Sequence, residues 1–105
     1  MATPAVTDIS TLLESKPGVL GGRLCLRGSR ISVHNVAGYY RVGITAEEMA
    51  ANNPDLSPAL FHAAVAYYLA NRERIDAEID EDERYAQELA AKHPNGISYE
   101  DLARE

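Results

Sequence analysis

The apolar positions of this chain recur at helical spacing over most of its length. Val33, Val36, Ala37 and Tyr40 fall on one face of a helix, which we expect to run from residue 33 to residue 41 or 42. Upstream of this helix, short apolar runs alternate with glycine and arginine. The pattern therefore predicts a mainly helical chain with a short non-helical segment near its N-terminus.

Two more helices are marked by the residues that cap them. Thr45 and Glu48 have the spacing of a capping box, and the helix they open is expected to end just before Pro54, which disfavours helical backbone at the preceding residue. Ser57 and Pro58 then supply a cap and a first-turn proline for the next helix. A broad apolar stripe follows, formed by Leu60, Phe61, Ala64, Val65, Tyr68 and Leu69.

The helical pattern continues beyond this stripe without glycine or proline as far as Pro94. Its apolar positions thin to Ile75, Ile79, Ala86 and Leu89, and these spacings resemble a coiled-coil seam. A helix of this length is longer than the preceding small domain can cover. We therefore expect the segment to need another chain, or to be partly disordered alone. A final short helix is expected beyond the proline, from Ser98.

The segment before the first long helix is rich in glycine and predicts β-hairpins. Glycine-containing pairs at residues 21–22 and 28–29 each lie between strand-like residues, and glycine adopts the positive φ that two-residue turns need. If residues 28–29 form such a turn, Arg27 and Arg30 face each other, and like charges there are destabilising. We therefore expect an anion or a carboxylate beside them. The short elements expected here are a helix from Thr7 or Asp8 to Leu13 and strands at residues 24–26 and 31–33.

Charge divides the chain into two parts. Residues 1–71 hold five acidic and five basic residues, and all five bases fall between residues 16 and 41. Residues 72–105 hold eleven acidic and five basic residues and carry the whole net charge of −6. We therefore expect one domain at residues 1–71 and an acidic helical extension at residues 72–105. The asymmetry indicates two different partners, or two copies in which the basic part of one meets the acidic part of the other. Alternatively, the acidic helix only keeps the protein soluble.

The location of the protein is predicted by what the sequence lacks. Its apolar runs are too short to span a bilayer, and its first residues have neither the basic start nor the apolar core of a secretory signal. Its single cysteine, Cys25, cannot form an internal disulfide. These features predict a cytoplasmic protein that does not enter a membrane.

Catalysis is not favoured by the distribution of reactive residues. His34, His62 and His93 fall on three different expected elements and share no metal-ligand spacing with Cys25 or a carboxylate. Cys25 lies in an apolar strand, where cysteine is usually a small buried side chain. Phosphate-binding, dinucleotide-binding and serine-nucleophile motifs are missing from the sequence. We therefore expect neither an enzyme, nor a metal, nor a cofactor.

Nucleic-acid binding agrees better with the sequence. The helices on either side of residues 52–57 have the lengths of a helix-turn-helix, whose second helix reads the major groove. Only Ser57 and His62 of that helix could reach base edges. Phosphate contact by arginine side chains is better supported. These arginines could instead pair with acidic residues of the helix at 46–52, or with the acidic C-terminal segment of a second subunit. The candidate phosphate-binding residues are Arg23, Arg27, Arg30 and Arg41.

The order of motifs resembles a known family. The string PGVLGGRLCLRGSRISVHNV, followed by GITAEEMAANNPDLSPALFHAAVAYYLANRERIDAEID, is similar to the bacterial domain-of-unknown-function 433 family over roughly residues 15–80. The departures from the family pattern are mild: Leu24 stands for a proline, Ser29 for threonine and Met49 for isoleucine. The matching positions are Gly22, Leu26, Gly28, Arg30, Ile31, Val33, Gly43, Glu47, Glu48, Pro54, Leu56 and Ser57.

The resemblance implies a fold and a function. The fold is a helix-turn-helix core of three helices, of the homeodomain-like or winged kind, here with an N-terminal β-hairpin and an extended C-terminal helix. The function is that of a VapB-like antitoxin, partnered by a PIN-like ribonuclease encoded alongside and able to bind operator DNA. The alternative is a dimeric interaction module that keeps a helix-turn-helix fold without binding DNA.

The acidic extension has two interpretations within this hypothesis. It could occupy the RNA-binding surface of the nuclease as an acidic mimic of RNA. Its spacing could equally form the seam of a homodimer. Both could hold, with dimerisation near residues 60–80 and capture of the nuclease beyond. The candidate partner-binding residues are Ile75, Ile79, Tyr85 and Leu89.

Overall fold

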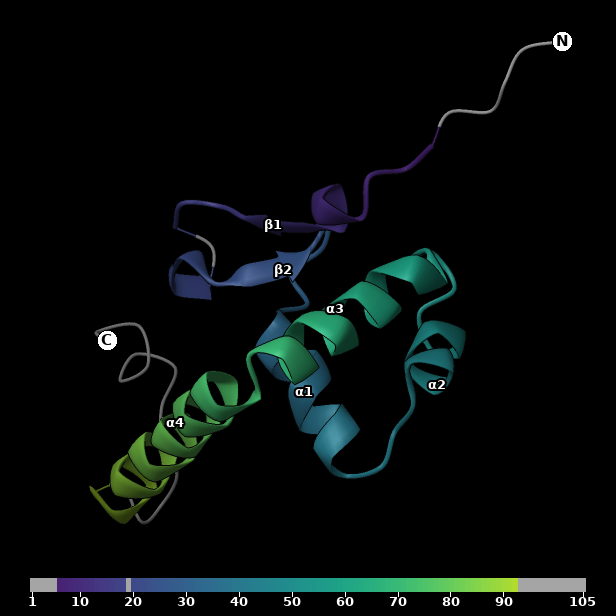
Figure 1. Cartoon of the computed structure of the whole chain (residues 1–105). Coiled ribbons are helices and arrows are strands. Elements are labelled where there is room, and N and C mark those ends of the chain that lie inside the picture. The colour runs from purple at the N-terminus through teal and green to yellow at the C-terminus, as the bar shows by residue number, and fades with distance from the viewer. Residues whose placement is uncertain (1–5, 19, 93–105) are drawn as a thin grey trace, which may run out of the picture. The chain divides into compact units, whose positions relative to one another are not determined.

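A computed structural model of the chain describes residues 6–18 and 20–92 (Figure 1). The final helix expected from Ser98, and His93, lie outside these residues. The chain divides into two compact units between Ile75 and Asp76, a few residues beyond the boundary expected after residue 71. The elements are the 3-10 turns η1 (Ile9–Leu12) and η2 (Leu20–Gly22), the strands β1 (Leu13–Ser15) and β2 (Leu24–Leu26), and the helices α1 (Val33–Arg41), α2 (Ala46–Ala51), α3 (Pro58–Ala70) and α4 (Arg72–Lys92).

Strands β1 and β2 form a two-stranded antiparallel sheet, in which Leu13 pairs with Leu26 and Glu14 with Cys25. The expected N-terminal helix is therefore too long, because η1 ends at Leu12 and β1 follows it directly. The two-residue turn expected at residues 21–22 is also wrong. These glycines, at φ of 65° and 80°, lie within the longer connection between the two strands.

The residues after β2 start a helix instead of a third strand. Only one bridge, between Cys25 and Ser32, joins them to β2. The Ser32 Oγ accepts a hydrogen bond from the Asn35 N–H at 3.0 Å, and the Asn35 side chain accepts one from the Ser32 N–H at 3.2 Å. This reciprocal capping box begins α1 at Val33, so the strand expected at residues 31–33 does not form.

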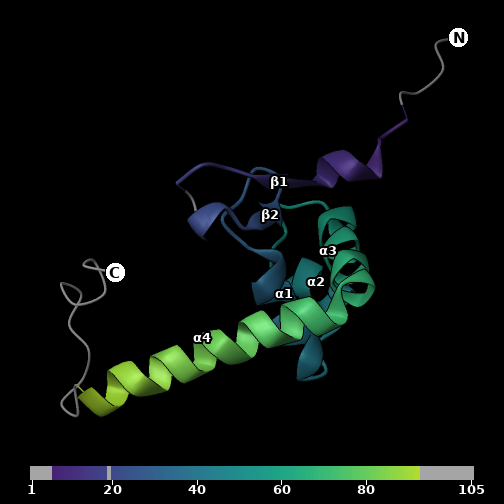
Figure 2. The ribbon, with the colours of Figure 1, turned by 60° about the vertical axis from the view of Figure 1, so that its left-hand side comes forward.

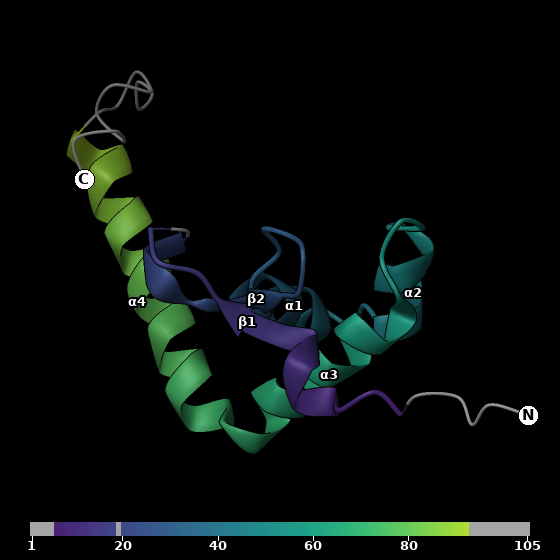
Figure 3. The ribbon, with the colours of Figure 1, turned by 90° about the horizontal axis from the view of Figure 1, so that it is seen from above.

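Helix α3 is the central element of the unit that ends at Ile75. It packs against α1 and α2 and also against η1, β1 and β2 (Figures 2 and 3). The predicted apolar stripe of α3 is not buried along its whole length, because the Leu69 side chain is 44% exposed. The core of the chain is formed by Leu12, Cys25, Leu26, Val33, Val36, Ala37, Ala46, Met49, Ala50, Leu60, Phe61, Ala64, Tyr68 and Ile75.

The helical pattern beyond residue 69 does not form one continuous helix. Helix α3 ends at Ala70, and Asn71 leaves the helical conformation at φ −128° and ψ 33°. The Asn71 side-chain amide donates to the carbonyl of Tyr67 at 3.0 Å and so satisfies an acceptor of the last turn. Helix α4 then begins at Arg72, whose guanidinium lies over the Tyr68 ring, 5.8 Å from its centroid.

Removal of the cap hydroxyls should affect stability according to burial. Ser32 is buried whereas Thr45, the equivalent cap of α2, is exposed. In Ser32→Ala the Asn35 N–H loses its acceptor where water has little access, so we expect a loss of about 1–2 kcal/mol in the free energy of unfolding. Thr45→Ala should lose about 0.5–1 kcal/mol. Urea denaturation measures both variants, and an equal or larger loss for Thr45→Ala would contradict this ranking.

Candidate functional site

The turn that carries Arg27 and Arg30 holds four residues instead of two. The Leu26 N–H donates to the carbonyl of Ile31 at 2.8 Å, so pairing stops before the two arginines. Gly28 has a φ of 76°, a conformation that glycine adopts without strain. The Ser29 Oγ donates to the Leu26 carbonyl at 2.9 Å and accepts from the Ile31 N–H at 3.1 Å. Arg27 and Arg30 are both exposed at the two ends of this turn, which we call the arginine turn, residues 27–30.

The carboxylate expected beside the arginine turn is supplied by Glu14 of β1. Its Oε2 accepts the Gly28 N–H at 2.7 Å and lies 3.2 Å from the Lys16 Nζ. The Gly28 N–H, followed by the Lys16 ammonium group, holds the pKa of Glu14 below its ordinary value, and the positive charge of Arg27 adds to this effect. The strand register explains the contact, since Glu14 pairs with Cys25, close to the turn.

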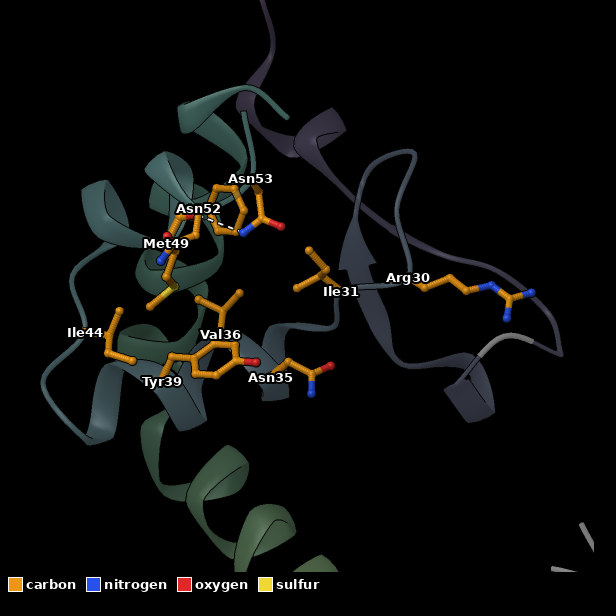
Figure 4. Close-up of a pocket in the computed structure, with 10 residues that line it drawn as sticks. Arg30, Ile31, Asn35, Val36, Tyr39, Ile44, Met49, Asn52 and Asn53 are labelled. Atoms are coloured by element: carbon orange, nitrogen blue, oxygen red, sulfur yellow. Dashed lines mark hydrogen bonds between the residues drawn. The ribbon is translucent and has the colours of Figure 1, made fainter. Parts of the chain in front are cut away.

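The other candidate phosphate-binding arginines come from different places in the same unit. Arg23 is half-buried just before β2 and lines a second hollow of about 480 Å³ together with His34 and Asn35. Arg41 is exposed in the last turn of α1. Only Arg27 and Arg30 therefore share one structural element. In Figure 4 the Arg30 side chain points away from the other labelled residues.

The candidate base-reading residues of α3 are engaged in local contacts. Ser57 is the N-cap of α3, and its Oγ accepts the Ala59 N–H at 3.3 Å. The Nε2 of His62 lies 3.7 Å from Oε1 of Glu47, which ties α3 to α2. Both side chains are exposed. Apart from His62 and two tyrosines, the residues of α3 are apolar, so the helix offers little for reading base edges.

The candidate partner-binding residues do not share one environment. Ile75 is only 2% exposed within the single chain, so its side chain belongs to the core. Ile79 and Leu89 are half-buried, and Tyr85 is 44% exposed. All three lie on α4, beyond the unit that ends at Ile75. The sequence pattern placed Ile75 in the same seam because its spacing to Ile79 is helical.

A pocket of about 450 Å³ lies among α1, α2 and α3, and nothing in the sequence indicates it (Figure 4). Its floor is apolar, and its rim carries amide and phenol groups. Asn53 is held at this rim because its side-chain amide donates to the carbonyl of Met49 at 2.8 Å. The asparagines look like ordinary cap and turn residues in the sequence, and only the fold brings them together. The lining residues are Arg30, Ile31, Asn35, Val36, Tyr39, Ile44, Met49, Asn52, Asn53 and Phe61.

Metal and membrane chemistry find no support in the part of the chain that the structure describes. Over residues 6–18 and 20–92, no three His, Cys, Asp or Glu side chains gather in a way that could hold a metal ion. None of the helices described is long and apolar enough to cross a membrane. Cys25 is a free, buried thiol whose Sγ lies 3.4 Å from the carbonyl oxygen of Arg23.

The Glu14 contact predicts a pH-dependent stability. Because the pKa of Glu14 is lower in the folded chain than in the unfolded chain, its contribution is present above the ordinary glutamate pKa of about 4.3 and is lost as pH falls through the folded value. Glu14→Gln should therefore be less stable than wild type at pH 7, and the difference should shrink as pH falls below about 4. The pKa of Asp8 is also lowered, chiefly by the Ser10 hydroxyl, but this contribution cancels in the comparison. Urea unfolding at several pH values measures this difference in the free energy of unfolding, and a difference that does not shrink as the pH is lowered would contradict the prediction.

Comparison with known proteins agrees with this arrangement of hairpin and helices. The model of a family described as a protein of unknown function, DUF433, matches residues 13–68, from β1 into α3. The chain is also similar to the crystal structure of a DUF433 member protein from Anabaena variabilis, with a TM-score of 0.59 and 36% identity, over 69% of this chain and 71% of that chain. No curated protein matches the chain. On the family match and the structural similarity together, the chain belongs to the DUF433 family.

Proposed function

We propose that this protein is an antitoxin, whose helix α4 binds and blocks a PIN-like ribonuclease. The observation that carries the proposal is the acidic helix itself, most of which belongs to the second unit and all of which follows the residues matched by the family model. In this role the protein acts by binding, without catalysis. Its compact unit uses α2 and α3 as a helix-turn-helix and contacts operator DNA as a second activity.

The charge of α4 is concentrated in its first half. Residues 75–83 contain six acidic residues and no basic one. Both Glu81 and Glu83 are exposed. A nuclease that binds RNA needs a positive surface, and an acidic helix complements that surface as the phosphates of RNA do. This complementarity supports a basic protein, rather than a nucleic acid, as the ligand of α4.

Apolar side chains on α4 supply contact area beside the charges. Tyr85 and Leu89 are one helical turn apart, so they lie on the same face of the helix. Tyr85 is 44% exposed, and aromatic side chains often dominate the binding energy of an interface. We assign Tyr85 and Leu89, with Ile79 six residues before Tyr85, as the anchors that hold α4 in place on the nuclease.

Charge reversal on α4 tests the proposal. The double variant Glu81→Lys/Glu83→Lys should weaken binding to the PIN-like ribonuclease encoded beside this gene by about a hundredfold, because attraction becomes repulsion. Isothermal titration with a catalytically inactive form of that ribonuclease measures the affinity. The matched control Glu47→Lys/Asp55→Lys makes the same charge change at exposed positions outside α4. Equal weakening by both doubles, or no binding by the wild type, would reject the proposal.

Operator binding is supported by the arginine turn. Arg27 and Arg30 are exposed and close together, whereas α3 presents few groups that read bases. Affinity should therefore come mainly from phosphate contacts, which depend steeply on salt. The alternative is a dimeric interaction module that keeps the fold without binding DNA. In that module Glu14 alone offsets the positive charge of the arginine turn.

A double alanine variant separates these two alternatives. Arg27→Ala/Arg30→Ala should weaken binding to a duplex from the promoter of this gene and reduce the slope of log K against log salt by about 2, one for each lost phosphate contact. Fluorescence anisotropy at several salt concentrations measures this slope. Arg74→Ala/Arg84→Ala removes the same charge from α4 and should leave the slope unchanged. No measurable binding of the wild type would favour the interaction module.

A further inference from the structure

The pocket among α1, α2 and α3 lies within one unit and reaches side chains of the core. Val36, Met49 and Phe61, each at most 4% exposed, form its floor. The half-buried Ile31 and Ile44 line it as well. Its volume of about 450 Å³ falls within the range of about 300–1,000 Å³ that small-molecule sites occupy. The pocket therefore has the size and the apolar interior of a site for a small molecule.

The carboxamide groups at the rim of this pocket use only part of their hydrogen-bonding capacity within the chain. Asn53 donates one amide N–H to the Met49 carbonyl at 2.8 Å, which leaves a second N–H and the amide oxygen. In Figure 4 this oxygen points away from Met49. The Asn35 oxygen accepts from the N–H and the hydroxyl of Ser32, which leaves the Asn35 amide N–H groups. The rim can therefore donate hydrogen bonds to a ligand and accept them from it.

The lining of the pocket is almost without charge. Among the described residues that line it, Arg30 alone is charged, and in Figure 4 its side chain points away from the other labelled residues. A charged ligand group that entered this apolar space would lose water without gaining a partner of opposite charge, which is unfavourable. The part of a ligand that enters the pocket is therefore uncharged, with polar groups along the edge that meets the rim.

We propose that this pocket binds an adenine base. Adenine is uncharged and planar, and one edge presents an amino donor beside a ring-nitrogen acceptor, which a single asparagine carboxamide can pair with at once. Asn53 has the oxygen and the N–H that this pairing needs. Phe61 and Tyr39 offer aromatic contacts to the ring, and the Met49 sulfur makes favourable contact with aromatic rings. Since Tyr39 and Asn35 are exposed, the pocket opens to solvent and the sugar attached to the base stays outside.

The inference is independent of the proposed antitoxin activity. The described residues that line the pocket fall between residues 30 and 61, before α4 begins, and the pairing does not use the Arg30 side chain. The adenine could belong to a free nucleoside or to an unpaired nucleotide of a single strand, because both present the same edge and the same ring faces. An apolar ring without polar groups is the competing occupant, and it would leave the carboxamides of the rim unused.

Methyl NMR of the full-length wild type locates the site. Adenosine should shift the methyl resonances of Ile31, Ile44 and Met49 and leave that of Ile79 on α4 unchanged. Toluene, which fits the apolar floor but has no polar edge, should bind about tenfold more weakly or worse. Shifts caused by a short strand of deoxyadenosine, but not by adenosine or by a strand without bases, would identify a base held within a strand. No shift of these methyls by adenosine or the strand, or equal binding of toluene, would overturn the inference.

Two matched aspartate variants test the role of Asn53. Asn53 and Asn71 each donate a side-chain N–H to the carbonyl four residues earlier, at 2.8 Å and 3.0 Å, but only Asn53 lines the pocket. Asn53→Asp replaces the amide donor with a carboxylate, so it should weaken binding of the adenine ligand, adenosine or the strand, about tenfold or more. Asn71→Asp makes the same change and should leave this affinity unchanged. Isothermal titration measures both, and equal affinities of the two variants would overturn the inference. The wild-type titrations remain decisive if Asn53→Asp does not fold.

Discussion

The burial of one side of α3 is the interaction on which the rest of the compact unit depends. Phe61, Ala64 and Tyr68 are almost fully buried, and α1, α2 and the sheet all pack against this helix. The other elements are short, with six residues in α2 and three in each strand, and elements of that length are not stable alone. Contact with α3 stabilises them. The Tyr40 ring, edge-on to Tyr68 at 6.0 Å between centroids, links α1 to the same core.

The charge distribution complements this apolar centre. With α3 uncharged, the charged groups that could select a partner lie at two separate places, the arginine turn and α4. The antitoxin proposal uses both places and assigns each a ligand of opposite sign.

The arginine turn shows how the fold offsets a local electrostatic cost. Two arginines at the ends of one turn repel each other, and the expected carboxylate comes from β1. Glu14 is thirteen residues upstream of Arg27, too far for any local sequence rule to link them. The register of β1 against β2 brings them together. Glu14 binds the turn through the Gly28 N–H, so the arginine side chains remain exposed for a phosphate.

The sequence by itself determined the features that depend on neighbouring residues. The caps at Ser57 and Thr45, the helices they begin and the charge asymmetry all follow from local hydrogen bonding and composition. The tertiary structure decided what depends on distant residues: the pairing of β1 with β2 across a long connection and the burial of Ile75. Helical spacing alone cannot show these, because the same apolar pattern fits a core, a seam or an anchor until the chain has folded and some of its faces are already covered.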